Sequence, residues 1–216
     1  MITLSVNPRN HGPSKRFWTA PSEHLTYGID SPETFYYRLA FLDCLRAAEY
    51  LFTRPEVDTA RVAAEGGSQG GLFAIALGTL EPRIRCVVSN VTAFSALPEG
   101  MILNTIGGAT SFRRLLDEGG ELAEQRTLSL RYVDAANMVT RLRAPLQINM
   151  AGQDPVCSFV TGIVIYNRVP NGVPREYNIV PDARHEVPGP MRQWNANWMQ
   201  RWLELDQAPS LPGAVL

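Results

Sequence analysis

Residues 66–71 read Gly66-Gly67-Ser68-Gln69-Gly70-Gly71, and this short stretch decides the fold of the chain. The residues before it, Arg61–Glu65, have the pattern of a short strand, and the apolar run Leu72–Leu77 after it has the pattern of a buried helix. A serine on a glycine-walled turn between a strand and a helix is typical of the G-x-S-x-G nucleophile elbow. The sequence therefore predicts an exposed serine hydroxyl at the top of a sheet.

The chemistry of such an elbow explains its residue types. Glycines flank the serine because the turn is too tight for neighbouring Cβ atoms. The helix begins directly behind Ser68, so its first N–H groups, led by that of Gln69, point to the place where an oxyanion would form. The alternative is a plain glycine turn in which Ser68 only caps the helix, and the six residues alone leave both interpretations open.

A serine nucleophile also needs a base, and the base needs a carboxylate that orients it. In α/β-hydrolases these groups follow the serine in the order acid, then histidine, each after a later strand. His185 is the only histidine downstream of Ser68, and it follows the strand-like run 177–180. Asp154 follows the buried-strand pattern at 146–150. The order predicts a triad of Ser68, Asp154 and His185.

Each member has a simpler interpretation when it is taken alone. His185 could be an ordinary loop histidine, and Asp154 with the following proline could form a plain turn. Two other acids, Asp182 and Glu186, lie too near His185 in the sequence to come from a separate strand end. The remaining histidines, at positions 11 and 24, precede the elbow and are interpreted as loop residues.

Further short stretches spread over residues 2–203 carry the same pattern as one known family: Glu33–Arg38, Arg54–Asp58, Gly66–Gly71, Arg131–Asn137, Asp154 with Cys157 three residues later, Ile165–Asn167 and His185–Glu186. They resemble the acetyl-xylan esterase and cephalosporin-C deacetylase family of α/β-hydrolases. The resemblance implies that Ser68 is the nucleophile, Asp154 the orienting acid and His185 the base. It also implies deacetylation of small acetylated sugars or related acetate esters, with no metal or organic cofactor.

The chain departs from the family pattern beside two of these residues. Ser158 and Phe159 stand where the family usually has two prolines after the cysteine, and Arg184 stands where a glycine usually precedes the histidine. Neither change removes a catalytic group. Arg184 places a bulky cation next to the proposed base.

The larger departure lies at the N-terminus. Ile2–Val6 resembles the fourth strand of the family, and the three strands that should come earlier are absent. In the family sheet the third strand lies between the fourth and the elbow strand, and the loop after it supplies a second oxyanion N–H from a tyrosine. No residue here can be assigned that role. We expect an N-terminally truncated α/β-hydrolase, the C-terminal part of a longer protein; the alternative is a natural short relative that has re-paired its sheet.

Strand and helix patterns alternate along the chain, which predicts an α/β fold with a mostly parallel sheet and flanking helices. At 216 residues and 45% hydrophobic content, we expect one domain over 1–216.

Three segments carry local signals of their own. Ser31-Pro32-Glu33 has the pattern of a helix start. Residues 93–126 break the alternation and predict a lid-like helical excursion, or else a surface insertion packed on itself. Residues 191–203, with tryptophans at 194, 198 and 202, predict a final amphipathic helix whose tryptophans serve as core or oligomer contacts.

Composition excludes several classes of partner. The net charge of −1 and a pI near 6.3 argue against nucleic acid or an anionic membrane. No signal peptide is visible, and no apolar run approaches the ~20 residues that span a bilayer. Three widely spaced cysteines predict reduced thiols in a cytoplasmic protein. The expected partner is a small acetylated ester, and the tryptophan-rich final helix leaves a homo-oligomer open.

Together with the resemblance, the sequence thus favours a serine carboxylesterase that removes acetyl groups from acetylated carbohydrates or related acetate esters. Two other functions stay open at this point. One is a peptidase or lactone hydrolase of the same superfamily, and the other is a non-catalytic or incomplete hydrolase module.

Overall fold

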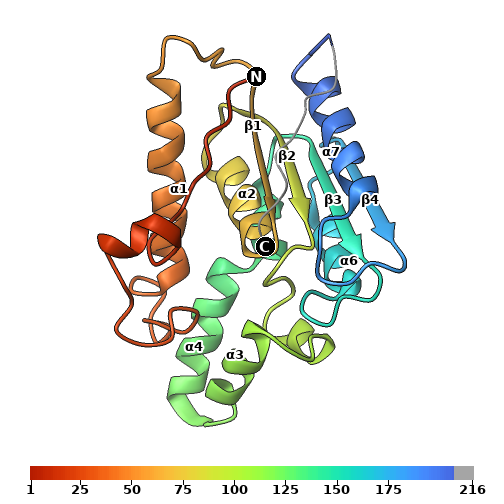
Figure 1. Cartoon of the computed structure of the whole chain (residues 1–216). Helices are drawn as coiled ribbons and strands as arrows, with labels where there is room; N and C mark the ends of the chain where they lie inside the picture. The colour runs from red at the N-terminus through yellow and green to blue at the C-terminus, as the bar shows by residue number, and fades with distance from the viewer. Residues whose placement is uncertain (207–216) are drawn as a thin grey trace.

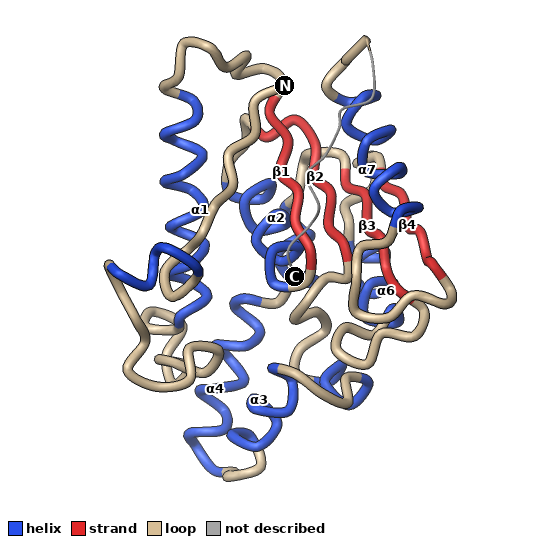
Figure 2. The backbone as a smooth tube through the Cα atoms, viewed as in Figure 1, coloured by secondary structure: helices blue, strands red, loops and turns tan. Residues whose placement is uncertain are grey.

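The computed structural model describes residues 1–206, which form a parallel sheet with helices on both faces (Figures 1 and 2). The sheet has the order β1-β2-β3-β4, and its strands are Val62–Gly67, Ile84–Asn90, Leu146–Ala151 and Arg175–Val180. Spatial order equals chain order, so each connection carries the chain from one strand to its immediate neighbour. The predicted α/β fold is confirmed.

The longer helices connect or flank these strands: α1 (Tyr36–Phe52), α2 (Gln69–Leu80), α3 (Gly108–Leu116), α4 (Gly120–Val133), α6 (Phe159–Arg168) and α7 (Gly189–Trp202). Short helical segments complete the set: η1 (Gly12–Arg16), η2 (Glu99–Leu103), α5 (Ala135–Met138) and η3 (Val139–Arg141). No helix in residues 1–206 is long and apolar enough to cross a membrane.

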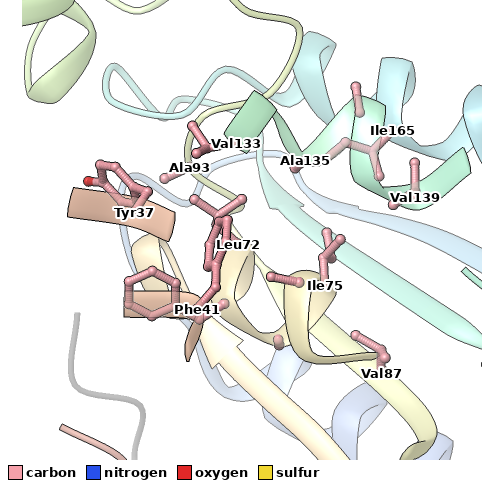
Figure 3. Close-up of a cluster of buried hydrophobic side chains, with 14 of the residues drawn as sticks. Tyr37, Phe41, Leu72, Ile75, Val87, Ala93, Val133, Ala135, Val139 and Ile165 are labelled. Carbon is pink, nitrogen blue, oxygen red and sulfur yellow. The ribbon is translucent and has the colours of Figure 1, made fainter. Parts of the chain in front are cut away.

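Alternation along β2 shows which helix covers which face of the sheet. Val87 lies against Gly78 of α2, where an added Cβ would come within 2.3 Å of the valine. Its neighbours Cys86 and Val88 pack instead on Trp198 of α7. Because successive strand residues point to opposite faces, α2 and α7 cover opposite sides. Figure 3 shows the core on the α2 side, with Val87 beside the helix.

The tryptophans of α7 contribute to the core, as expected. Trp198 is only 2% exposed and packs with Cys86 and Val88, while Trp202 is half-buried against the same cluster. Trp194 packs half-buried against a neighbouring cluster. Cys86 and the other two cysteines are buried free thiols.

The expected helix start at residues 31–33 is wrong, because the first residue of α1 is Tyr36, four residues after Pro32. The Ser31 side chain caps a local turn, where its hydroxyl accepts the N–H of Glu33 at 3.2 Å. Phe35 then adopts an extended conformation, and the N–H of Tyr36 donates to the carbonyl of Tyr27 at 2.9 Å. Serine favours such turns as readily as helix caps, so the sequence pattern did not discriminate between them.

The strand implied for Ile2–Val6 is also not formed. Residues 1–6 lie outside any strand, and the alternate side chains of Ile2, Leu4 and Val6 are 54%, 40% and 39% exposed. A strand exists only through its hydrogen bonds to a neighbour. Among residues 1–206, β1 lies at the edge of the sheet and pairs with β2 alone.

The helical excursion between β2 and β3 lies beyond the carboxyl ends of the strands (Figure 1). Residues 93–126 contain η2, α3 and the first half of α4, which continues past the expected end to Val133. Asp134, which directly follows α4, forms hydrogen bonds with the residues at the start of the excursion. Its carboxylate accepts the N–H groups of Ala96 and Leu97, both at 2.9 Å, and that of Ala136 at 2.8 Å.

Candidate active site

Ser68 occupies the turn between β1 and α2 in a conformation that few residues adopt. Its φ and ψ angles are +53° and −119°, and a positive φ is unfavourable for any residue with a Cβ. Its N–H donates to the carbonyl of Asn90 at 2.9 Å, and its carbonyl accepts the N–H of Gly71 at 3.0 Å. The strained turn is thus fixed on both sides, as the elbow motif predicts.

The glycines of the elbow are not equally necessary. A Cβ on Gly66 would lie 2.1 Å from the carbonyl oxygen of Gly70, and one on Gly71 would lie 2.7 Å from the hydroxyl of Ser89. A Cβ on Gly70 would meet no heavy atom within 4 Å. Of the two glycines in the G-x-S-x-G pattern, only Gly66 therefore has no room for a Cβ, and Gly71, which lies just outside the pattern, is similarly tight.

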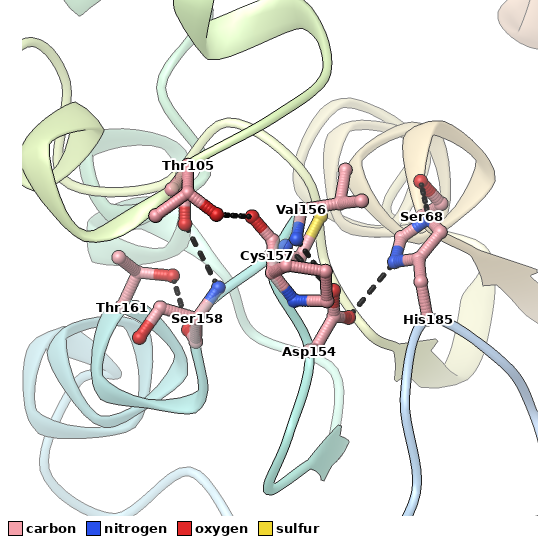
Figure 4. A network of polar contacts seen from close by, with 10 residues as sticks. Ser68, Thr105, Asp154, Val156, Cys157, Ser158, Thr161 and His185 are labelled. Atoms are coloured by element: carbon pink, nitrogen blue, oxygen red, sulfur yellow. Dashed lines mark hydrogen bonds and ion pairs between the residues drawn. The ribbon is translucent and has the colours of Figure 1, made fainter.

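The structure brings Ser68, His185 and Asp154 into one line (Figure 4). His185 Nε2 lies 2.9 Å from Ser68 Oγ, and His185 Nδ1 lies 2.8 Å from Asp154 Oδ2. The three residues come from the carboxyl ends of β1, β3 and β4, where loops of parallel strands converge. This is the hydrogen-bond order that a serine nucleophile, a base and an orienting acid require.

Asp154 is positioned by its own loop. Its Oδ1 accepts the N–H groups of Val156 and Cys157 at 2.8 and 2.9 Å, and its side chain is fully buried. These bonds leave Oδ2 to accept the Nδ1–H of His185, which fixes the tautomer with a free Nε2 lone pair toward Ser68. The rival acids Asp182 and Glu186 are exposed and make no hydrogen bond to the His185 ring.

Gln69, the proposed oxyanion donor, is the first residue of α2. Within residues 1–206 its backbone N–H has no hydrogen-bond partner, which leaves this donor free at the helix N-terminus. Its side-chain amide donates to the hydroxyl of Tyr37 at 2.7 Å. Tyr37 is completely buried, and that burial raises the pKa of its hydroxyl, so it stays a neutral acceptor for Gln69.

A cavity of about 180 Å³ opens beside Ser68. Its apolar wall consists of Leu25, Ala93, Phe94, Ala109 and Val156, joined by Gly108 and Cys157. Its polar groups are Ser68, Gln69, His24 and Asn104.

The sequence did not identify these wall residues. His24 was interpreted only as a loop residue, and Asn104 lay within the excursion without an assigned role. No local pattern marks either one, because they reach the cavity through long-range packing. The other N-terminal histidine, His11, is paired with the hydroxyl of Tyr36 at 3.0 Å and does not line this cavity.

The Sγ atom of Cys157 lies beside Asp154 and His185, and all three residues carry atoms that can bind a metal ion. Donor atoms of Asp154, Cys157 and His185 all lie within 4.8 Å of one another. A metal would need the thiolate and the free ring nitrogen. Burial raises the pKa of the Cys157 thiol, with the nearby Asp154 carboxylate acting in the same direction, and His185 Nδ1 is already bonded to Asp154. The arrangement suits a hydrogen-bonded triad with a neutral thiol behind it.

Comparison with known proteins decides the family. The sequence model of the acetyl xylan esterase (AXE1) family matches residues 9–202. The chain belongs to this family. Among curated proteins, acetyl esterase Axe7A of Xylanibacter ruminicola is 28% identical over 178 residues, which cover 82% of this chain and 39% of that protein.

Two solved acetyl xylan esterases share the fold at a TM-score of 0.73 and 30% identity. The enzyme from Paenibacillus sp. R4 is matched over 83% of this chain and 56% of its own. Acetyl xylan esterase 1 from Thermoanaerobacterium sp. JW/SL YS485 is matched over 87% of this chain and 59% of its own. This AXE1-family chain thus spans about 40 to 60% of the length of these relatives.

Proposed function

We propose that this chain is a serine carboxylesterase that removes acetyl groups from acetylated carbohydrates. The observation that carries the proposal is the line of hydrogen bonds from Ser68 Oγ through the His185 ring to the buried Asp154 carboxylate. In this scheme Ser68 is the nucleophile, His185 the general base and Asp154 the group that holds the base in the productive tautomer.

The acylation step begins as His185 Nε2 takes the proton of the Ser68 hydroxyl. Ser68 Oγ attacks the ester carbonyl carbon, and the carbonyl oxygen becomes an oxyanion that accepts the free N–H of Gln69. His185 then gives its proton to the departing alcohol oxygen, so the C–O bond breaks and an acetyl group stays on Ser68. Asp154 stabilises the imidazolium form of His185 in between.

Deacylation runs through the same groups in reverse. His185 accepts a proton from a water molecule, and the resulting nucleophile attacks the acetyl carbonyl carbon. Collapse of the second tetrahedral intermediate returns the proton from His185 to Ser68 Oγ and releases acetic acid, which then ionises to acetate in solution. The chain residues therefore end in their starting protonation states, which a catalytic cycle requires.

The size of the cavity supports a short acyl group. Its volume of about 180 Å³ is below the ~300–1,000 Å³ typical of sites for drug-sized ligands. Leu25, Ala93 and Phe94 offer apolar contacts to a methyl group. The names of the relatives, acetyl xylan esterase and acetyl esterase, point to acetylated xylan as the substrate.

The decisive test compares hydrolysis of p-nitrophenyl acetate by the chain and by its Ser68→Ala variant. We expect the variant to lose ~10⁴- to 10⁶-fold in kcat, with an unchanged circular dichroism spectrum. Labelling of Ser68 by a fluorophosphonate probe should be lost in parallel. Equal background rates in both folded proteins would contradict the proposal and favour a non-catalytic module.

A substrate panel separates the remaining alternatives. Acetate esters should be cleaved faster than esters of longer acyl chains, because a longer acyl chain would compete with the alcohol part of the substrate for a cavity of only about 180 Å³. Preference for aminoacyl amides or for lactones would instead indicate a peptidase or a lactone hydrolase of the same superfamily.

A further inference from the structure

Two polar residues of the cavity wall take no part in the Ser68–His185–Asp154 line. They are His24, from the loop before α1, and Asn104, which directly follows η2. The proposed reaction leaves both unused. Their hydrogen bonds show which of their atoms remain free for a ligand.

Asn104 has a defined amide orientation. Its side-chain Oδ1 accepts the N–H of Ser158 at 2.9 Å, and its backbone carbonyl accepts from the Arg113 guanidinium at 3.2 Å. Since a backbone N–H can only donate, the oxygen must face Ser158, and the NH₂ group must face the other way. Asn104 is only 5% exposed and lines the cavity, and within residues 1–206 its Nδ2 has no hydrogen-bond partner. A buried amide is thus held so that its donors are free.

His24 is held in a similar manner by packing. The centroid of its ring lies 5.3 Å from the ring centroid of Tyr36 and 5.4 Å from that of His11, and both pairs are arranged edge to face. The preceding residue, Glu23, accepts the hydroxyl of Ser111 on α3 at 2.9 Å, which ties the loop to the excursion. In the described part of the chain, the His24 ring nitrogens make no hydrogen bond.

The surroundings of the His24 ring favour its neutral form. Burial lowers the pKa of His24, and electrostatic repulsion from the neighbouring His11 ring acts in the same direction. A neutral imidazole offers one donor and one acceptor, and the Asn104 NH₂ group offers two donors. A sugar hydroxyl is both a donor and an acceptor, so these atoms are complementary to a polyhydroxylated alcohol.

We infer that His24 and Asn104 form the subsite for the sugar part of the ester, where they bind hydroxyl groups next to the acetylated one. The inference rests on the proposed esterase function and adds the residues that select a carbohydrate over a plain acetate ester. The apolar wall binds the acetyl group, while these two residues bind the leaving alcohol.

The first experiment measures discrimination between two substrates. Asn104→Leu removes the amide at similar volume, and His24→Phe keeps the ring but removes its nitrogens. For each variant, kcat/KM on acetylated xylobiose is divided by kcat/KM on p-nitrophenyl acetate, which has no sugar hydroxyls. We expect this ratio to fall about tenfold in each variant, the effect of one lost hydrogen bond, chiefly through KM.

An unchanged ratio in both variants would overturn the inference. An equal loss on both substrates would also overturn it, because that result assigns the residues to the acyl group or the oxyanion. Asn171→Leu, at an exposed turn asparagine, is the matched control for removal of an amide away from the cavity, and its ratio should equal that of the wild type.

Asn104 could also act only through the loop that carries Asp154, since it holds Ser158. Ser158→Pro removes the same loop hydrogen bond but keeps the amide, and the φ of −56° at Ser158 suits proline. Ser158→Ala, which keeps the N–H, controls for the lost hydroxyl. We expect the ratio for Ser158→Pro to stay closer to wild type than that for Asn104→Leu. An equal fall would overturn the direct role.

Direct binding separates this inference from the esterase proposal. Calorimetry on the Ser68→Ala protein measures the affinity for acetylated xylobiose without turnover. We expect binding that weakens about tenfold when Asn104→Leu or His24→Phe is added. If the two substitutions weaken binding but the chain never hydrolyses esters, the esterase proposal fails and the sugar subsite stands. If the chain hydrolyses esters but the substitutions leave binding unchanged, the subsite fails and the esterase proposal stands.

Discussion

The two sides of the active site are built in different ways. On one side, which we call the strand-end wall, Ser68, Asp154 and His185 each follow the end of a parallel strand within five residues. On the other, His24 and Asn104 come from irregular segments that several local contacts hold in place, among them the hydrogen bonds of Glu23 and Asn104. The backbone hydrogen bonds between the parallel strands fix the strand-end wall. Because these bonds align the carboxyl ends of the strands, the three residues that follow those ends come together. The other side depends on many separate contacts, any of which can be lost without unfolding the sheet.

After Ser68→Ala, the largest effect should come from Asp154→Asn, which tests the strand-end wall. The amide can still accept from Val156 and Cys157, but its NH₂ group would face His185 Nδ1 and favour the wrong tautomer. We expect about a 10⁴-fold loss in kcat on p-nitrophenyl acetate with little change in thermal stability.

The exposed acids Asp182 and Glu186 provide the controls for that variant. Asp182→Asn and Glu186→Gln should hydrolyse p-nitrophenyl acetate at nearly the wild-type rate, since neither side chain bonds the His185 ring. A loss in Glu186→Gln as large as that in Asp154→Asn would show that another acid orients His185.

A second comparison sets two glycines of the elbow against each other. Gly66→Ala would place a Cβ 2.1 Å from a backbone carbonyl oxygen, so the turn must shift. We expect a loss of about 3 kcal/mol or more in the free energy of unfolding, measured by urea denaturation. Gly70→Ala has open space on a helix, so its free energy of unfolding should stay within about 1 kcal/mol of wild type. Equal effects would show that the turn relaxes more than its geometry indicates.

A smaller effect is expected where the excursion is anchored. Asp134→Ala leaves the N–H groups of Ala96, Leu97 and Ala136 without their acceptor, which should cost about 2 kcal/mol of unfolding free energy. Asp134→Asn keeps one acceptor oxygen and should lose less. Amide hydrogen exchange should rise at residues 96 and 97 while the strands stay protected. Uniform loss of protection would mean that the excursion and the sheet unfold as one unit.

The sequence predicted the strand-end wall because its signals are local. The glycine-serine turn, the apolar runs at 146–150 and 177–180, and the polar residue after each run lie within a few residues of one another. It failed at Ser31, where a cap residue forms a turn instead of a helix start. It also failed at residues 2–6, because an extended, apolar pattern cannot reveal whether a neighbouring strand is present to pair with.

A layer of buried amides shows the same limit. Asn149 donates to Asn90 at 2.9 Å and to Asn195 of α7 at 2.7 Å, and Asn195 donates to Glu65 at 2.7 Å. These residues lie up to 130 positions apart, and their polarity in the sequence would suggest an exposed surface. Only packing of α7 on the sheet makes them mutual hydrogen-bond partners, as buried polar groups require.

The sequence by itself determined the α/β pattern, the serine on its glycine turn and the order of the acid and the histidine. These follow from periodicity, turn chemistry and strand ends, which are properties of short segments. The tertiary structure alone decided which glycines of the turn have no room for a Cβ, and that His24 and Asn104 line the cavity. Each of those outcomes depends on distances between residues far apart in the chain, which only the packed fold establishes.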